Sequence, residues 1–287
     1  PVQNLDKVER VHFPWPSLNT CLARVVTFGG AIVLTGYAGW QMYLIIATGG
    51  ITLLQWVLMS LFVPTFFWIA FAAAGAIAGV LFGNRKPASQ PGTLPSGRTV
   101  LLMPVYNENP VNTFASLFAM ASGLIANQAQ DKFEIFVISD TQNPEVWIQE
   151  IQAYERLRSA LQGKLQVWYR RRHFNSAKKA GNVHDFVTRW GVRYDYMIVL
   201  DADSFLEPVT LMRLGCEMDA DPHCGILQTL PKLYGGKTLF ARLQQFAGSL
   251  YGPVVARAIT AWQGNDGHYW GHNAIIRIGA FASAAGL

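Results

Sequence analysis

The amino-acid sequence predicts an α/β protein in which two N-terminal transmembrane helices precede a domain built on a mostly parallel sheet. The first observation is that residues 25–84 contain no Asp, Glu, Lys or Arg. A bilayer favours such a run, because a charge near its centre is costly and its backbone groups must be satisfied internally. The second is that, from residue 98, short apolar runs alternate with longer helical patterns. This alternation is typical of a parallel sheet covered by helices.

The uncharged region is long enough for two crossings, because about 20 apolar residues cover the hydrocarbon core. We expect a first span over 25–46. A second apolar segment over 51–82 is too long for one straight perpendicular crossing, so we expect it to tilt, to begin in the interface or to kink at Pro64.

Three glycines of the second span, Gly75, Gly79 and Gly83, repeat every four residues and therefore share one helix face. Such a face allows another helix to approach closely. The alternative interpretation is that glycine is simply common in membrane helices.

Basic residues flank the uncharged region on both sides, and the loop between the two spans has none. The positive-inside rule therefore places both ends of the chain in the cytoplasm. We expect a cytoplasmic N-terminal segment over 1–24, a two-helix transmembrane region over 25–84, a linker over 85–97 and a cytoplasmic domain over 98–287. The flanking basic residues are Lys7, Arg10, Arg24, Arg85, Lys86 and Arg98.

Composition excludes some classes of partner and site. The net charge is +5, but the basic residues are scattered, so we expect no nucleic-acid partner. Anionic lipid head groups or an anionic substrate account for the charge better. The three cysteines have no framework spacing, which argues against a disulfide-stapled chain.

The second region reads as alternating strands and helices. The predicted strands are 98–103, 133–139, 165–169, 196–200 and 225–229. The predicted helices between them are 111–128, 144–161, 178–190 and 208–220. A later helix over 238–256 has one apolar stripe, which is consistent with a position near the membrane or with packing on the sheet of its own domain.

Polar residues follow all five predicted strands. In open parallel sheets, ligands bind beyond the carboxyl ends of the strands, so these residues should meet at one edge. The five groups in chain order are Pro104-Val105-Tyr106-Asn107-Glu108, Asp140, Arg170-Arg171-Arg172, Asp201-Ala202-Asp203 and Gln228-Thr229.

The pair Asp201 and Asp203 follows a five-residue apolar run. Two carboxylates at a strand end can hold one Mg²⁺ or Mn²⁺ that also binds a diphosphate. Taken alone, an Asp-x-Asp is often a turn or a cap. Asp140 can accept hydrogen bonds from a base or a ribose, or it can cap the next helix. Lys179 and the three arginines can face phosphates, although an arginine run is often a solvated surface.

These residues, together with Lys179-Ala180-Gly181-Asn182 and Gly271–Arg277, resemble a known family. It is that of the processive, membrane-embedded inverting glycosyltransferases of family 2 with a Rossmann-like GT-A fold, which includes the cellulose and hyaluronan synthases. The resemblance implies a UDP-glucose donor, a growing β-glucan acceptor, and the bilayer of the bacterial inner membrane with further transmembrane helices around the chain. It also implies synthesis of osmoregulated periplasmic glucans.

The resemblance assigns roles to individual residues. Asp140 would bind the uridine and Lys179 the diphosphate, while Asp201 and Asp203 would bind the metal, Mg²⁺ or Mn²⁺. The donor-binding residues it implies are Pro104, Tyr106, Glu108, Asp140, Lys179, Asp201 and Gln228. The acceptor-side residues are Gly271, His272 and Asn273.

The catalytic base is expected beyond Leu287, so we expect the domain to be incomplete at its C-terminus. Asp266 is the only acid near the acceptor-side motif, and we do not expect it to be the base. Two alternatives remain open: a glycosyltransferase acting on a lipid-phosphate acceptor, and a non-catalytic membrane module that senses nucleotides.

Overall fold

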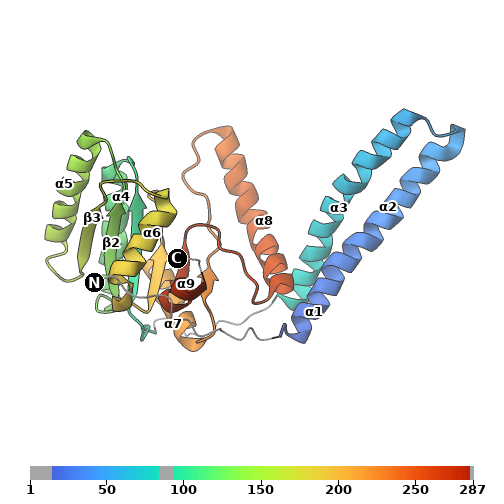
Figure 1. Ribbon diagram of the computed structural model, residues 1–287. Coiled ribbons are helices and arrows are strands. Elements are labelled where there is room, and N and C mark those ends of the chain that lie inside the picture. The colour runs from blue at the N-terminus through green and yellow to red at the C-terminus, as the bar shows by residue number, and fades with distance from the viewer. Residues whose placement is uncertain (1–14, 84–92, 285–287) are drawn as a thin grey trace. The chain divides into compact units, whose positions relative to one another are not determined.

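The computed structural model describes residues 15–83 and 93–284, which form two compact units (Figure 1). The helical unit contains 15–83 and Leu230–Gly267. The sheet unit contains 93–229 and 268–284. Leu230–Gly267 thus groups with the apolar helices. The predicted domain over 98–287 includes this segment. Residues 1–14 and 84–92, which hold most of the expected N-terminal segment and linker, lie outside the described residues.

The first apolar helix begins earlier than the predicted span. It comprises α1 (Leu18–Arg24), a π-helical turn over Val25–Gly29, α2 (Gly30–Ile46) and a 3₁₀ turn over Ala47–Gly49. Ser17 is the N-cap, because its side chain accepts a hydrogen bond from the backbone N–H of Thr20. The charge of Arg24 therefore lies inside the helix rather than before it.

The second apolar helix is α3 (Leu53–Phe82), and it contains Pro64 without interruption. It begins at a capping box, in which Thr52 and Gln55 satisfy each other's backbone N–H groups. Most of its large apolar side chains are exposed, including Leu53, Trp68 and Val80. Both helices are long and apolar enough to cross a membrane, which confirms the two predicted apolar helices.

The glycine face of α3 packs against α8 (Leu239–Gln263). A Cβ on Gly79 would lie 2.6 Å from the backbone nitrogen of Ala258, so the two backbones are in direct contact there. A Cβ on Gly83 would lie 3.0 Å from the carbonyl oxygen of Arg257. Close packing is therefore the correct interpretation of the glycine repeat, and α8 makes its contacts with α3 and α1.

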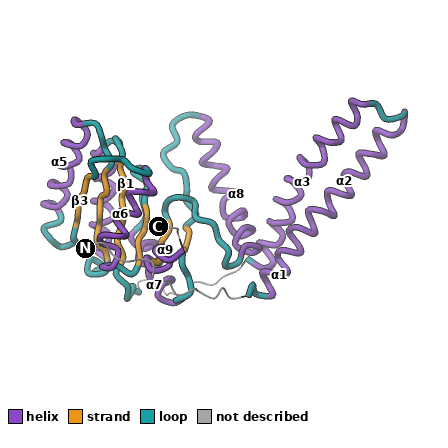
Figure 2. The backbone as a smooth tube through the Cα atoms, in the orientation of Figure 1, coloured by secondary structure: helices purple, strands orange, loops and turns teal. Residues whose placement is uncertain are grey.

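The sheet unit has six strands in the order β3-β2-β1-β4-β6-β5 (Figure 2). The first four are parallel, whereas β6 is antiparallel to both of its neighbours. The strands are β1 (Thr99–Val105), β2 (Phe133–Ser139), β3 (Val167–Arg171), β4 (Tyr196–Val199), β5 (Ile226–Gln228) and β6 (Ala274–Arg277). The helices are α4 (Pro110–Ala126), α5 (Pro144–Ala160), α6 (Lys178–Trp190), α7 (Pro208–Ala220) and α9 (Ile278–Ala284).

The five predicted strands and four predicted helices of this unit are all present, with shifts of a few residues at their ends. The prediction missed β6, which lies inside the acceptor-side motif and has only four residues. It assigned no pairing to 225–229; in the structure β5 pairs antiparallel with β6, which lies between β5 and β4.

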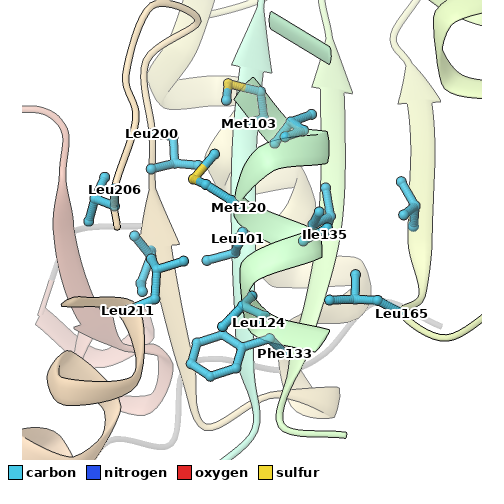
Figure 3. Packing of buried hydrophobic residues seen from close by; sticks show 14 of the residues in the cluster. Leu101, Met103, Met120, Leu124, Phe133, Ile135, Leu165, Leu200, Leu206 and Leu211 are labelled. Atoms are coloured by element: carbon cyan, nitrogen blue, oxygen red, sulfur yellow. The ribbon is translucent and has the colours of Figure 1, made fainter. Parts of the chain in front are cut away.

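The core has two halves, one on each face of the sheet. Alternate residues of β1 face opposite ways, so Leu101 and Met103 pack with Met120 of α4 and with residues of α5 and α7 (Figure 3). Val100 and Leu102 pack on the other face, with residues of α6 and α9. Helices thus cover both faces, and the polar strand ends remain at one edge.

Candidate active site

The carboxyl ends of β1 to β4 lie at one edge of the sheet because these strands are parallel. Two successive antiparallel pairings make β5 run in the same direction as β4, so Gln228 also ends there. Since β6 runs the opposite way, it begins at this edge, next to Asn273. The edge therefore collects the predicted donor-side and acceptor-side residues from different parts of the chain.

Lys179 joins Asp201, a predicted metal ligand, to Gly271 of the predicted acceptor-side motif. Its ammonium group donates a hydrogen bond to the Oδ1 atom of Asp201, and another, of 3.0 Å, to the carbonyl oxygen of Gly271. The Nε2 atom of His272 lies 3.8 Å from Oδ2 of Asp201. Lys179 comes from the first turn of α6, so one cation links three segments.

The residues present are compatible with a divalent metal. Asp203 is exposed, and its carboxylate has no ion-pair partner among the described residues. The side chain of Asp201 is 39% exposed, and its carboxylate is paired with the ammonium group of Lys179. A metal ion could take the place of this positive charge. The described residues contain no cluster of three or more acidic, His or Cys side chains. Two carboxylates suit Mg²⁺, which usually takes its other ligands from phosphates and water.

Asp140 is 3% exposed and is bound by Arg172 through both oxygens. Nε of Arg172 lies 2.6 Å from Oδ1, and a terminal nitrogen lies 2.7 Å from Oδ2. This hydrogen bonding raises the pKa of Arg172 from its ordinary value. Asp140 is not a helix cap, because Asn143 caps α5. A nucleoside could reach the carboxylate of Asp140 only by sharing it with Arg172 or displacing Arg172.

The other two arginines of the run are also engaged. Arg170 donates to Asn182 at 2.9 Å and to Asp185, both on α6. The guanidinium of Arg171 lies 3.5 Å from the ring centroid of Trp147. The solvated-surface interpretation therefore does not describe these two side chains, and their position near phosphates stays a prediction.

The segment after β1 turns sharply beside the site. Pro104 is within β1, whereas Tyr106 is 49% exposed in the loop. Glu108 folds back and accepts a hydrogen bond from the backbone N–H of Tyr106. Burial raises the pKa of the Glu108 carboxyl, and the negative charges of Glu150 and Asp201 raise it further. Between them, Asn107 adopts a left-handed conformation with φ of 60°.

Gln228 holds the acceptor-side motif rather than projecting freely from the strand. Its amide nitrogen lies 3.0 Å from the carbonyl oxygen of His272, and its amide oxygen accepts the N–H of Trp270 at 3.0 Å. Buried atoms without partners, among the described residues, include Nδ1 of His272 and Oδ1 of Asn273. The neighbouring Tyr269 has its pKa raised to about 12, by burial and by the charge of Asp201.

Thr141 and Glu150 also belong to this edge, and the sequence analysis missed both. Glu150 is 1% exposed and accepts hydrogen bonds from Ser139, Thr141 and Tyr169. The only local signal for Glu150 is an acid on an otherwise helical stretch, which also fits a solvated position.

The sheet and its strand-end site define the class of protein: a glycosyltransferase with the GT-A fold. The chain belongs to glycosyl transferase family 2, whose model matches residues 100–283. This match confirms the predicted fold class and the family-level resemblance.

The relatives specify the group within the family. The chain is 42% identical to glucans biosynthesis glucosyltransferase H of Vibrio cholerae over 294 residues, covering 100% of this chain and 41% of that protein. It is 45% identical to the protein of the same name from Shewanella oneidensis over 268 residues, covering 92% of this chain and 37% of that protein. For the Bradyrhizobium diazoefficiens protein the identity is 44%, with coverages of 92% and 36%.

The chain therefore spans about two fifths of the length of these relatives. The motifs Leu102–Glu108, Tyr169–Arg172 and Gly271–Arg277 predict a resemblance to glucosyltransferase H, and the identity over the whole chain confirms that resemblance. A solved mannosyltransferase of Pyrobaculum calidifontis, in complex with GDP-Man and Mn²⁺, aligns at a TM-score of 0.47 and 16% identity, covering 73% of this chain and 55% of that one. A likeness this distant identifies neither the donor nor the metal here.

Proposed function

We propose that this chain forms the donor-binding part of an inverting glucosyltransferase that transfers glucose from UDP-glucose to a growing β-glucan, for osmoregulated periplasmic glucans. The observation that carries the proposal is the convergence of Lys179, Asp201 and the Gly271–His272 segment at one sheet edge. Relatives named glucans biosynthesis glucosyltransferase H support glucose and a glucan as the chemistry.

Each residue at the edge has a proposed task. Lys179 compensates charge on the diphosphate, and Asp140 with Arg172 forms the nucleoside side of the site. Tyr106 and Glu108 close the donor site from the loop after β1, with Pro104 setting the start of that loop. Gln228 lies on the donor side, and its hydrogen bonds hold the segment of Gly271, His272 and Asn273 on the acceptor side. The roles of Arg172 and of Gln228 as a support come from these hydrogen bonds, and the other roles follow the family resemblance.

Asp201 and Asp203 would hold the divalent metal, Mg²⁺ or Mn²⁺. When bound, such an ion neutralises charge on the leaving nucleoside diphosphate. Inversion also needs a base to take the proton of the acceptor hydroxyl. We assign that base to none of the described residues, and Asp266 is engaged with Arg24 at 2.8 Å.

The two apolar helices support a position at a bilayer. We propose that the membrane is the bacterial inner membrane, with both ends of the chain on the cytoplasmic side, where UDP-glucose is available. We also retain the sequence-based domain division into 1–24, 25–84, 85–97 and 98–287 as a proposal.

Titration calorimetry of the protein in detergent micelles tests this function. UDP-glucose and UDP are titrated with and without Mg²⁺ or Mn²⁺. We expect metal-dependent binding that Asp203→Asn weakens about tenfold or more, and that Lys179→Met weakens even without metal. Asp131→Asn is the matched control, because this exposed acid lies in the turn before β2, at the opposite edge.

Two outcomes would contradict the proposal. If the folded protein does not bind UDP-glucose, then UDP-glucose is not the donor. If all variants bind it equally well, then Asp203 and Lys179 do not belong to the donor site. The chemical nature of the product then distinguishes a glucan acceptor from a lipid-phosphate acceptor. A water-soluble glucan made by the full-length protein agrees with the proposal, whereas a product that partitions into organic solvent indicates a lipid-phosphate acceptor.

A further inference from the structure

A buried carboxylate supports the nucleoside side of the site from the opposite face of the sheet. Glu150 of α5 is 1% exposed. Its Oε2 atom accepts the hydroxyl of Ser139 at 2.7 Å and that of Tyr169 at 2.8 Å, and its Oε1 atom accepts the hydroxyl of Thr141. Within the described residues no basic side chain forms an ion pair with it, so its acceptors are occupied by neutral hydroxyl groups.

The two hydroxyl residues at the end of β2 flank Asp140. Successive side chains of an extended segment point to opposite faces, so Ser139 and Thr141 face α5 while Asp140 faces α6. Glu150 therefore holds the backbone on both sides of Asp140, and Arg172 holds the carboxylate itself at 2.6 and 2.7 Å. Two independent sets of hydrogen bonds therefore hold Asp140, one through its neighbours in the chain and one through its carboxylate.

Thr141 carries the same restraint to the loop after β1. Its hydroxyl oxygen accepts the backbone N–H of Asn107 at 2.9 Å while its proton goes to Glu150. The side-chain oxygen of Asn107 in turn accepts the N–H of Asn143 at 3.2 Å. Asn107 has φ of 60°, a left-handed conformation that asparagine adopts more readily than most residues, and these two hydrogen bonds hold it there.

From this geometry we infer that Glu150 is a positioning residue: it sets the relative placement of Asp140 and the Tyr106–Glu108 loop, the two segments that hold the donor nucleotide. The inference rests on the proposed function for its ligand, but the placement itself is a property of the chain. Because Glu150 is buried, it acts through the hydroxyl groups of Thr141 and Ser139.

A carboxylate is suited to this position because it only accepts hydrogen bonds, whereas all three of its neighbours donate. In Glu150→Gln, one acceptor becomes an NH₂ donor that faces a hydroxyl, so at least one hydroxyl must reorient. In Thr141→Val, the N–H of Asn107 loses its acceptor at nearly constant side-chain volume. Thr141→Ser keeps the hydroxyl and should restore both bonds.

The chain supplies a matched control for the loss of one buried hydrogen bond. Tyr169 donates to Glu150 at 2.8 Å, and Tyr194 donates to the buried Glu134 at 2.7 Å. Glu134 is the second residue of β2, far from the carboxyl edge of that strand. Tyr169→Phe and Tyr194→Phe thus remove the same hydroxyl-to-carboxylate bond, but only the first belongs to the network of Glu150.

The experiment has two readouts on the full-length protein in detergent. The first is hydrogen exchange of peptides covering 104–108, which needs no ligand. The second is the dissociation constant for UDP-glucose, compared at temperatures where each variant is fully folded. We expect Glu150→Gln and Thr141→Val to speed exchange in 104–108 and to raise the dissociation constant about tenfold, with Thr141→Ser within about threefold of wild type. Tyr169→Phe should shift both readouts in the same direction, and Tyr194→Phe should shift neither.

Unchanged exchange in 104–108 in Thr141→Val and Glu150→Gln would overturn the inference, whatever the ligand result. So would effects of equal size in Tyr194→Phe, since these would indicate general destabilisation. If Glu150→Gln does not fold, the variants of Thr141 and Tyr169 still test the inference. Changed exchange without any UDP-glucose binding by wild type would support the placement role of Glu150 and contradict the proposed donor.

Discussion

Arg172 binds Asp140 as a planar fork, with two hydrogen bonds of 2.6 and 2.7 Å to the two carboxylate oxygens. The same guanidinium also donates to the carbonyl oxygen of Lys178 at 3.1 Å, immediately before Lys179. One side chain therefore connects the end of β2 with the first turn of α6. The pair therefore orients Asp140 and Lys179 relative to each other, and we propose that these two residues face the nucleoside and the diphosphate.

Arg172→Lys should destabilise the sheet unit and weaken UDP-glucose binding. Lysine keeps the charge but cannot make the bidentate contact. Because the Arg172 side chain is only 13% exposed, we expect a loss of about 1–3 kcal/mol in the free energy of unfolding. Chemical denaturation measures this loss, and calorimetry measures the affinity.

The control for this change is Arg189→Lys, since Arg189 also uses Nε to bind a carboxylate, that of Asp185 at 2.7 Å, but its side chain is 57% exposed. It should cost well under about 1 kcal/mol. Equal losses in the two variants would mean that the buried fork has no special role.

Glu134 should make the sheet unit sensitive to acid. Burial alone raises the pKa of Glu134, but hydrogen bonds from Tyr194 and Trp168 and the charges of Arg193 and Arg98 lower it, and the lowering prevails. A folded-state pKa below the unfolded value gives stability that is present above the unfolded pKa, 4.5, and is lost as pH falls through the folded pKa.

The measurement is the thermal midpoint of wild type and Glu134→Gln between about pH 7 and about pH 3. Wild type should lose more stability than the variant on acidification, and the two curves should converge at the acid end. Parallel curves would contradict the assigned pKa direction. Asp131→Asn, which removes an exposed acid next to β2, controls for the change in net charge.

Gly79→Ala should loosen the contact between α3 and α8. The added Cβ would lie 2.6 Å from the backbone nitrogen of Ala258, where no flexible side chain can move away, so the helices must separate. Overpacking of this kind costs about 1–3 kcal/mol. Thermal unfolding in detergent should give a lower midpoint for the variant. Limited proteolysis, as a separate measurement, should cleave the variant within 230–267 earlier than wild type.

Gly36→Ala is the control, because Gly36 lies in α2 and a Cβ there meets nothing within 4 Å. It should leave stability unchanged or slightly increased, since alanine favours helix over glycine. If Gly79→Ala behaves like Gly36→Ala, then the close approach of α3 and α8 contributes nothing to stability.

Local patterns in the sequence were sufficient for much of the architecture. The absence of charge over 25–84 predicted two apolar helices, and the strand 133–139 was predicted with the bounds of β2. The reason is that hydropathy, periodicity and turn residues act over a few neighbouring residues. The rule that polar residues gather at strand ends then placed Asp140, Asp201 and Gln228 at one edge.

The pairing of β6 and the partners of the arginine side chains could not be predicted from local patterns. The four residues of β6 carry too little pattern to distinguish a strand, and their antiparallel place between β4 and β5 depends on contacts distant in sequence. The engagement of the arginine run has the same cause: Arg170 is paired with residues of α6, and Arg172 with Asp140 directly after β2. A local pattern cannot distinguish a paired guanidinium from a solvated one.

Apolar helices, an α/β glycosyltransferase sheet and the acids that end its strands can all be predicted from the amino-acid sequence. The packing of α8 on the glycine face of α3, the pairing of Arg172 with Asp140 and the hydrogen bonds of Glu150 to Ser139 and Thr141 are evident only in the folded chain. The two differ because strand and helix formation depend on local hydropathy and backbone preference. The partners of buried polar groups depend instead on which distant segments meet when the core closes.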